Sequence, residues 1–179
     1  MNEATSPKDI SIAQAIRFMR SNRPLRTEEL CRDYLSKNPG CTEHLRLLSH
    51  ALMKQNRLTE AEEKLRFAIS LSPNYPQLHE DLGSVFAMQS RFDEAIPELE
   101  KAIQLQPALP LAHKKLGQAL AAVGRGKDAD EEFQRYINSD PNRETVIKAA
   151  DILNEERSEE AIDALRAGLK NKHDDVKDM

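Results

Sequence analysis

The stretch PQLHEDLGSVFAMQSRFDEAIPELEKAIQLQP, from Pro76 to Pro107, decides the fold of this 179-residue chain. In both of its halves, apolar and small side chains recur at the spacing of a helix. A polar turn at 89–91 separates the halves, and Pro107 ends the second one because proline lacks an amide donor and clashes with the preceding turn. The stretch therefore predicts a helical hairpin over 76–109.

This hairpin recurs along the chain at a constant period and without insertion. Equivalent positions, which we call columns, keep the size of their side chains from one repeat to the next. The columns include a terminal proline, a small residue, a second small residue and a large apolar residue: Pro39, Pro73, Pro107 and Pro141; Ala15, Ser49, Gly83 and Gly117; Thr27, Ala61, Ala95 and Ala129; Cys31, Leu65, Leu99 and Phe133. A fixed repeat of this kind predicts a stack in which each unit covers its neighbour.

The columns resemble those of the tetratricopeptide repeat family, whose 34-residue helix-turn-helix carries small, aromatic, alanine and proline residues at fixed offsets. The likeness is close over 8–143, and it implies an all-α, right-handed superhelical solenoid of antiparallel helix pairs. The expected organisation begins with a disordered arm over 1–8 and four hairpins over 9–41, 42–75, 76–109 and 110–143. A degenerate fifth hairpin or pair of capping helices over 144–171 and a disordered tail over 172–179 follow.

Local signals refine these hairpins. Thr42 is suited to cap the amides at the start of its helix, whereas Pro97, a turn inside a trailing helix, predicts a local bend or a late helix start. The turn residues tolerate a left-handed backbone, and each precedes an arginine: Asn22, Asn56, Ser90 and Gly124. We expect the arginine side chains to reach the last carbonyls of the preceding helix; a basic ladder along one edge is the alternative.

Composition excludes several classes of protein. The chain has 26 Lys and Arg residues against 30 Asp and Glu, a net charge of -4 that argues against binding to nucleic acid or an anionic membrane. Neither a leader nor an apolar run long enough to span a membrane occurs, which predicts a cytoplasmic protein. Ranges 76–109 and 144–179 are acidic, either as solvated outer faces or as a stripe for a basic partner. Cys31 and Cys41 are not expected to form a disulfide.

No pattern of catalytic or metal-binding residues is evident. The motifs for zinc, phosphate loops and activated nucleophiles are missing from the sequence. His79 and His113 share a column a full repeat apart, so they cannot share one metal, and we expect them to pack between helices. The sequence therefore predicts a chain that is not an enzyme and that uses neither cofactor nor metal.

The family resemblance implies a binding surface instead. In tetratricopeptide repeats the leading helices line a concave groove that holds an extended peptide or a partner helix. The columns that face this groove contain side chains of mixed charge with methionines between them, which suits a segment with both charges and apolar anchors. The implied peptide-binding residues are Arg46, His50, Met53, Lys54, Glu80, Asp81, Ser84, Met88, Lys114, Lys115 and Gln118.

Three other interpretations stay open. The columns of family members that clamp a terminal carboxylate are occupied here by Arg46, His50, Asp81, Leu111 and Lys115; this makes a weak match, because Asp81 would repel the ligand. The array also resembles substrate-presenting modules at the amino-terminal side of larger bacterial enzymes such as sulfotransferases. Alternatively, a poorly capped terminal repeat would pair with itself, giving a self-associating adaptor such as a homodimer.

Overall fold

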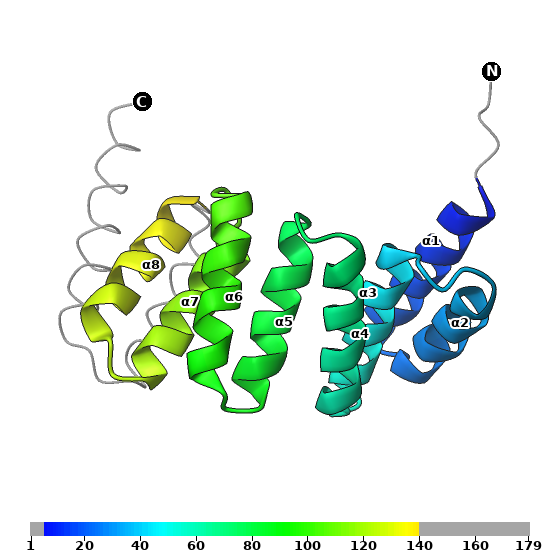
Figure 1. Ribbon diagram of the computed structural model, residues 1–179, viewed down its shortest axis with the longest axis horizontal. Helices are drawn as coiled ribbons and strands as arrows, with labels where there is room; N and C mark the ends of the chain where they lie inside the picture. The colour runs from blue at the N-terminus through cyan, green and yellow to red at the C-terminus, as the bar shows by residue number, and fades with distance from the viewer. Residues whose placement is uncertain (1–5, 140–179) are drawn as a thin grey trace, which may run out of the picture. The chain divides into compact units, whose positions relative to one another are not determined.

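The computed structural model describes residues 6–139, which form eight α-helices and no strand (Figure 1). The helices are α1 (Pro7–Arg20), α2 (Pro24–Lys37), α3 (Thr42–Lys54), α4 (Leu58–Leu71), α5 (Pro76–Met88), α6 (Phe92–Leu105), α7 (Pro110–Ala122) and α8 (Gly126–Ser139). They correspond to the leading and trailing helices of the four predicted hairpins, two helices to each hairpin. The predicted fifth hairpin over 144–171, the tail over 172–179 and most of the arm lie outside the described residues.

Helix α1 begins earlier than predicted. Ser6 is its N-cap: the Ser6 side chain accepts a hydrogen bond from the Asp9 amide at 3.2 Å, and the Asp9 carboxylate accepts one from the Ser6 amide at 3.3 Å. This capping box satisfies two amides that a helix start leaves without partners. Pro7 and Lys8, which we expected in a disordered arm, are therefore helical.

The chain divides into two compact units, and the first contains α1 to α5. Its helices pack on their neighbours in sequence: α1 on α2 and α3, α2 on α3, α3 on α4 and α5, and α4 on α5. The repeat columns supply the buried side chains between them. These include Ala15, Cys31, Leu48, Leu52, Ala61, Leu65, Leu78, Leu82 and Phe86. The core of this unit is thus spread along successive pairs of helices.

The second unit contains α6, α7 and α8, with α7 packed on both of the others. Leu99 of α6, Leu116 of α7 and Phe133 of α8 are buried in it. Gly117 explains why its column stays small, because a Cβ atom there would lie 2.9 Å from the Phe133 ring. A larger side chain would push the two helices apart.

The turns within the hairpins share one geometry. Their four predicted left-handed residues all have positive φ: Asn22 at 52°, Asn56 at 59°, Ser90 at 60° and Gly124 at 79°. The amide of the arginine that follows donates in each case to the carbonyl five residues earlier, at 2.9 Å. This backbone bond closes the helix end in the manner of a Schellman motif, so the carbonyl does not need the arginine side chain.

One local prediction is wrong, and for Pro97 one of the two predicted outcomes, the late helix start, is excluded. Cys41, not Thr42, is the N-cap of α3, and Thr42 Oγ1 instead lies 3.1 Å from Ser72 Oγ. Pro97 does not delay its helix, because α6 already begins at Phe92 and contains the proline. Burial of the flanking Ile96 and Leu99 favours the helix and offsets the hydrogen bond that proline cannot make.

Candidate functional site

The surface of α3 and α5 in the first unit is built on one buried carboxylate. Asp81 of α5 is 6% exposed. Arg46 Nε donates to Asp81 Oδ2 at 2.8 Å, and His50 Nε2 lies 2.7 Å from the same oxygen. Arg46 and His50 are four residues apart on α3, so both side chains lie on one face of that helix. One carboxylate thereby fixes two side chains that remain partly exposed.

The electrostatics of this cluster favour an ionised Asp81. Burial raises the pKa of Asp81, but the hydrogen bond and charge of His50 and those of Arg46 outweigh burial and hold the pKa below its usual value. The same ion pair outweighs the effect of burial on Arg46 and raises the pKa of its guanidinium. The predicted repulsion between Asp81 and a ligand carboxylate is therefore largely neutralised within the protein.

The other predicted groove residues of this unit differ in exposure. Lys54 and Met88 are exposed near the ends of α3 and α5, whereas Met53 and Ser84 are half-buried. Ser84 Oγ donates to the backbone carbonyl of Glu80 at 2.7 Å, and Glu80 itself is 7% exposed. Both predicted acidic residues are thus buried, and the accessible charges of this set come from Arg46, His50 when protonated, and Lys54.

In the second unit, the predicted residues Lys114, Lys115 and Gln118 are all half-buried on α7. Lys114 Nζ lies 5.9 Å from the centre of the Tyr136 ring, within the range of a cation–π contact. Leu111, at a position of the carboxylate clamp, is 55% exposed and supplies no charge. The accessible polar surface of α7 therefore has a basic character as well.

His79 and His113 have structural partners. His79 Nε2 lies 2.8 Å from the Pro73 carbonyl and His113 Nε2 lies 2.9 Å from the Pro107 carbonyl, so each ring contacts the proline that ends the preceding repeat. His113 Nδ1 also lies 2.7 Å from Glu132 Oε2. The Pro-x5-His spacing, present in both repeats, was the sequence signal for the contact with the proline carbonyl. The contact between His113 and Glu132 was not predicted. Within 6–139 no group of His, Cys, Asp and Glu residues could hold a metal ion.

Comparison with known families agrees with this architecture. Tetratricopeptide repeat models match residues 12–76, 46–110 and 86–150. The chain belongs to the tetratricopeptide repeat family. Its fold is accordingly an all-α helical repeat solenoid, and repeats of this family generally mediate protein interactions without catalysis.

Solved structures of other tetratricopeptide repeat proteins share the fold. A thermophilic repeat protein of Thermus thermophilus is 16% identical, with a TM-score of 0.76 over 88% of this chain and 87% of its own. MamA is 20% identical, with a TM-score of 0.71 over 91% and 96% of the two chains. YrrB, described as having an unusual peptide-binding site, is 18% identical, with a TM-score of 0.64 over 87% and 80%. No match was found among curated proteins.

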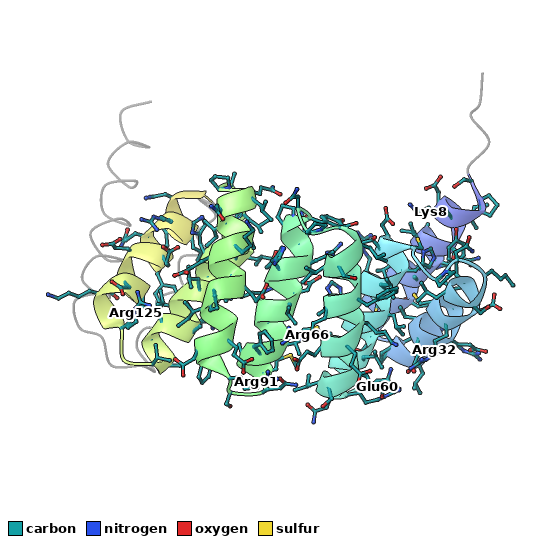
Figure 2. All side chains as sticks on the ribbon, in the orientation of Figure 1. Lys8, Arg32, Glu60, Arg66, Arg91 and Arg125 are labelled. Atoms are coloured by element: carbon teal, nitrogen blue, oxygen red, sulfur yellow. The ribbon has the colours of Figure 1, made fainter. Side chains whose placement is uncertain are left out.

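Adjacent tetratricopeptide repeats are joined by ion pairs that the sequence analysis missed. Arg57 Nη1 donates to Glu28 at 2.8 Å, and one repeat later Arg91 Nη1 donates to Glu62 at 2.7 Å. Each glutamate also accepts from an arginine one turn along its own helix, Arg32 or Arg66. Arg32, Glu60, Arg66 and Arg91 lie along one edge of the unit (Figure 2). Glu28 and Glu62 share a column, and this recurrence was the available signal.

These contacts change the interpretation of the turn arginines. Burial raises the pKa values of Glu28 and Glu62. At Glu28 the hydrogen bonds from Gln55, Arg32 and Arg57 outweigh burial and hold the pKa below its usual range. At Glu62 the hydrogen bonds from Arg91 and Arg66 do the same. The side chains of Arg57 and Arg91 are therefore bound to carboxylates, and the Arg57 side chain does not donate to the helix carbonyls that we predicted. Both arginines tie one repeat to the next.

A second unpredicted cluster joins the first two repeats. His44 is fully buried, and its ring stacks on Tyr34 with centroids 3.8 Å apart. His44 Nε2 lies 2.9 Å from Ser11 Oγ, and Nδ1 lies 3.1 Å from Cys41 Sγ. Burial lowers the pKa of His44, which favours the neutral ring. Cys31 is a buried thiol whose pKa is raised by burial to about 12, so it stays protonated; both cysteines are free, as predicted.

No helix within the described range 6–139 has the length and apolar character needed to cross a membrane.

Proposed function

We propose that this chain is a non-enzymatic interaction scaffold, which binds an extended peptide or a partner helix on its leading helices. The observation that supports this best is the cluster on α3 and α5. Buried Asp81 holds Arg46 and His50 in fixed orientations while their side chains remain 30% and 28% exposed. Side chains oriented before binding lose less conformational entropy when a partner contacts them.

The chemistry of the partner follows from what is accessible. With Glu80 and Asp81 buried, Arg46 and Lys54 supply positive charge, and Met53 and Met88 supply flexible apolar surface. Lys114 and Lys115 give α7 the same character. We therefore expect a partner segment that carries carboxylates and apolar anchors, since arginine binds carboxylates in a planar fork and methionine adapts to varied side chains.

The family and one structural relative support the same proposal. Tetratricopeptide repeats commonly bind peptides, and YrrB is described as having a peptide-binding site. A module of a larger enzyme would use this surface in the same way, to hold a substrate protein. Location in the cytoplasm stays a prediction from the sequence.

A peptide selection tests the proposal. Peptides of random sequence would be selected on the immobilised chain, and the best one measured by fluorescence anisotropy against single variants. We expect Lys54→Glu and Met88→Ala to weaken its binding at least tenfold, about 1.4 kcal/mol. Lys64→Glu and Leu71→Ala are matched controls on the trailing helix α4 and should leave the affinity within about twofold of wild type, less than about 0.5 kcal/mol.

Two results would contradict the proposal. One is a failure to select any peptide that binds above background. The other is a peptide whose affinity falls with the α4 variants and is insensitive to the variants on α3 and α5. Circular dichroism of each variant separates a lost contact from a lost fold.

A further inference from the structure

The turn of the first hairpin carries an unusual concentration of positive charge. Residues 17–26 contain four arginines and no acidic residue. Arg17, Arg20, Arg23 and Arg26 are all exposed at the end of α1 and the start of α2. Ile16 and Leu25 beside them are 37% and 68% exposed. We call these six residues the arginine corner.

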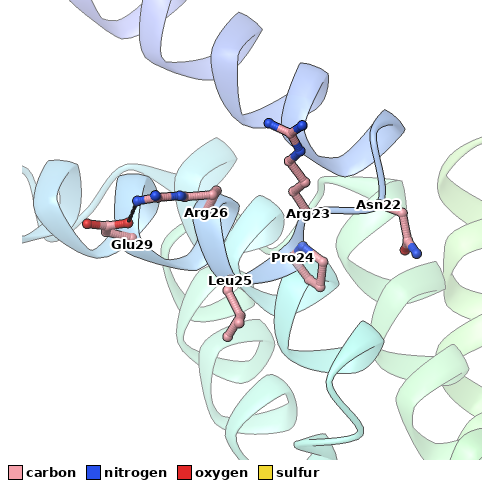
Figure 3. Close-up of a pocket in the computed structure, with 6 residues that line it drawn as sticks. All are labelled: Asn22, Arg23, Pro24, Leu25, Arg26 and Glu29. Atoms are coloured by element: carbon pink, nitrogen blue, oxygen red, sulfur yellow. Dashed lines mark hydrogen bonds and ion pairs between the residues drawn. The ribbon is translucent and has the colours of Figure 1, made fainter.

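Part of this corner borders an open hollow of about 510 Å³, which is lined by Asn22, Arg23, Pro24, Leu25, Arg26 and Glu29. Figure 3 shows these six side chains. Arg26 Nη1 donates to Glu29 Oε2 at 2.8 Å on the exposed surface. Arg17, Arg20 and Arg23 form no ion pair with any residue from 6 to 139. Arg17 and Arg20 lie in the last turn of α1, where the helix dipole favours positive charge, but that effect does not account for Arg23.

The later repeats show what Arg23 lacks. Arg57 pairs with Glu60 of its own repeat and with Glu28 of the preceding repeat. Arg91 pairs with Glu62 in the same way, and Arg125 pairs with Asp128. In the first hairpin the column of Glu60 and Asp128 holds Arg26, and the column of Glu28 has no counterpart in an earlier repeat of this sequence. Arg23 thus faces the side from which carboxylates reach the equivalent arginines of later repeats.

The same chain contains a segment of complementary composition. Residues 151–163, DILNEERSEEAID, hold six acidic residues and one basic residue. Ile152, Leu153 and Ile162 add apolar side chains that suit the exposed Ile16 and Leu25. Because arginine and carboxylate pair in a bidentate fork, the corner and the composition of this segment match in charge and in apolar character.

We propose that the arginine corner is a docking surface for a second copy of this chain, which it contacts through the acidic residues of segment 151–163. A second copy is the occupant that we favour, because every copy of this chain carries both the arginine corner and the complementary acidic segment. This contact does not involve the peptide-binding surface of α3 and α5.

The proposal has a geometric consequence. The corner and the segment are different parts of the chain, so the contact is heterologous, and an open assembly of any size keeps one unused corner and one unused segment. Association of this kind continues beyond two chains unless a ring closes. It also weakens as salt rises, because exposed charges are screened over about 30 Å at 0.01 M ionic strength but over about 3 Å at 1 M.

Light scattering of the full chain over a range of concentrations tests this. We expect the mean mass to rise with concentration at about 0.01 M salt and to stay at that of one chain at about 1 M. The neutral variants R17Q/R20Q/R23Q and E155Q/E156Q/E159Q should each remain monomeric at low salt. The control K37Q/K101Q/K127Q removes the same charge from exposed positions elsewhere and should associate as wild type does.

A mixture of the two neutral variants sharpens the test. Each retains the surface that the other has lost, so together they should form a complex of two chains that grows no further. A wild-type chain that is monomeric at low salt at every concentration would overturn the proposal. Association that survives in R17Q/R20Q/R23Q would also overturn it. Association that is lost in Lys54→Gln on α3 but kept in R17Q/R20Q/R23Q would show that α3 is the contact surface instead. Circular dichroism confirms that each variant is folded.

Discussion

The first hairpin and the later ones use the same columns differently. Ile10 and Leu78 occupy one column, yet Ile10 is 49% exposed and Leu78 is fully buried. Gln14 is exposed in the column where Leu48 and Leu82 are 1% exposed. The later residues lie on leading helices that pack against an earlier pair, whereas α1 packs on α2 and α3. Burial of these two columns therefore depends on an earlier helix pair that covers the leading helix.

The largest effect is expected for substitutions in the column of Gln14 and Leu82, and it tests the difference in burial directly. Leu82→Ala should lower the free energy of unfolding by about 2 to 5 kcal/mol, because it removes buried methyl groups and leaves a cavity. Gln14→Ala, in the same column of the first hairpin, should change it by less than about 0.5 kcal/mol. Urea unfolding of both variants measures the difference. Equal losses would show that the first hairpin is covered as the third is.

The next largest effect on stability is expected at Asp81, the buried carboxylate on α5. Asp81→Ala should cost about 1 to 3 kcal/mol, because Arg46 and His50 lose a hydrogen-bonded anion and remain only partly hydrated. Asp33→Ala breaks an exposed pair with Lys37 on α2, where both side chains are 71% exposed, and should cost less than about 0.5 kcal/mol. Similar losses in urea unfolding would mean that water reaches Asp81 as freely as it reaches Asp33.

His44 shares its column with Ile10 and Leu78, and it shows what burial by an earlier helix does to a titratable group. Its folded pKa is lowered by burial, whereas an unfolded histidine titrates at about 6.5. Below that pH the unfolded chain binds the proton more readily, so stability should fall as pH drops from about 6.5 through the folded pKa.

His44→Leu should flatten the fall in stability over this range, which thermal unfolding at a series of pH values would reveal. A second loss should appear in both proteins below the unfolded pKa of Asp, about 3.9, because the folded pKa of Asp81 is lowered. An identical decline in wild type and variant between neutral pH and about 5 would exclude His44 as its cause.

The sequence predicted the repeat better than it predicted the contacts between repeats. Period and column size placed a helical hairpin in each of the ranges 42–75 and 76–109, where the structure has α3 and α4 and then α5 and α6, because the positions that pack are set by helical spacing within one hairpin. The left-handed turns followed from Asn and Gly chemistry. Ion pairs between repeats were harder to predict, since Glu28 and Arg57 belong to different hairpins and only the packing of those hairpins brings them together.

The candidate site shows the same limit. The columns identified which residues stand on the leading helices, but they treated Asp81 as a groove residue equal to Lys54. In the structure Asp81 is buried beneath Arg46 and His50, whereas Lys54 is exposed. Burial of an ionised carboxylate is costly unless cations or hydrogen-bond donors come to it, and the pairing of Asp81 with Arg46 and His50 is a property of two helices together. Peptide binding on this surface stays a prediction.

The smallest expected effect concerns the turn arginines, and it compares the first hairpin with the second in one column. Arg57→Gln should lower the thermal midpoint, because it breaks ion pairs with both Glu28 and Glu60. Its effect should shrink at high salt, since the arginine is partly exposed and screening weakens such pairs. Arg23→Gln removes no ion pair with a described residue and should leave the midpoint unchanged at every salt concentration. A loss at Arg23 equal to that at Arg57 would mean that a carboxylate already reaches Arg23 within the single chain, leaving no partner for a second copy to supply.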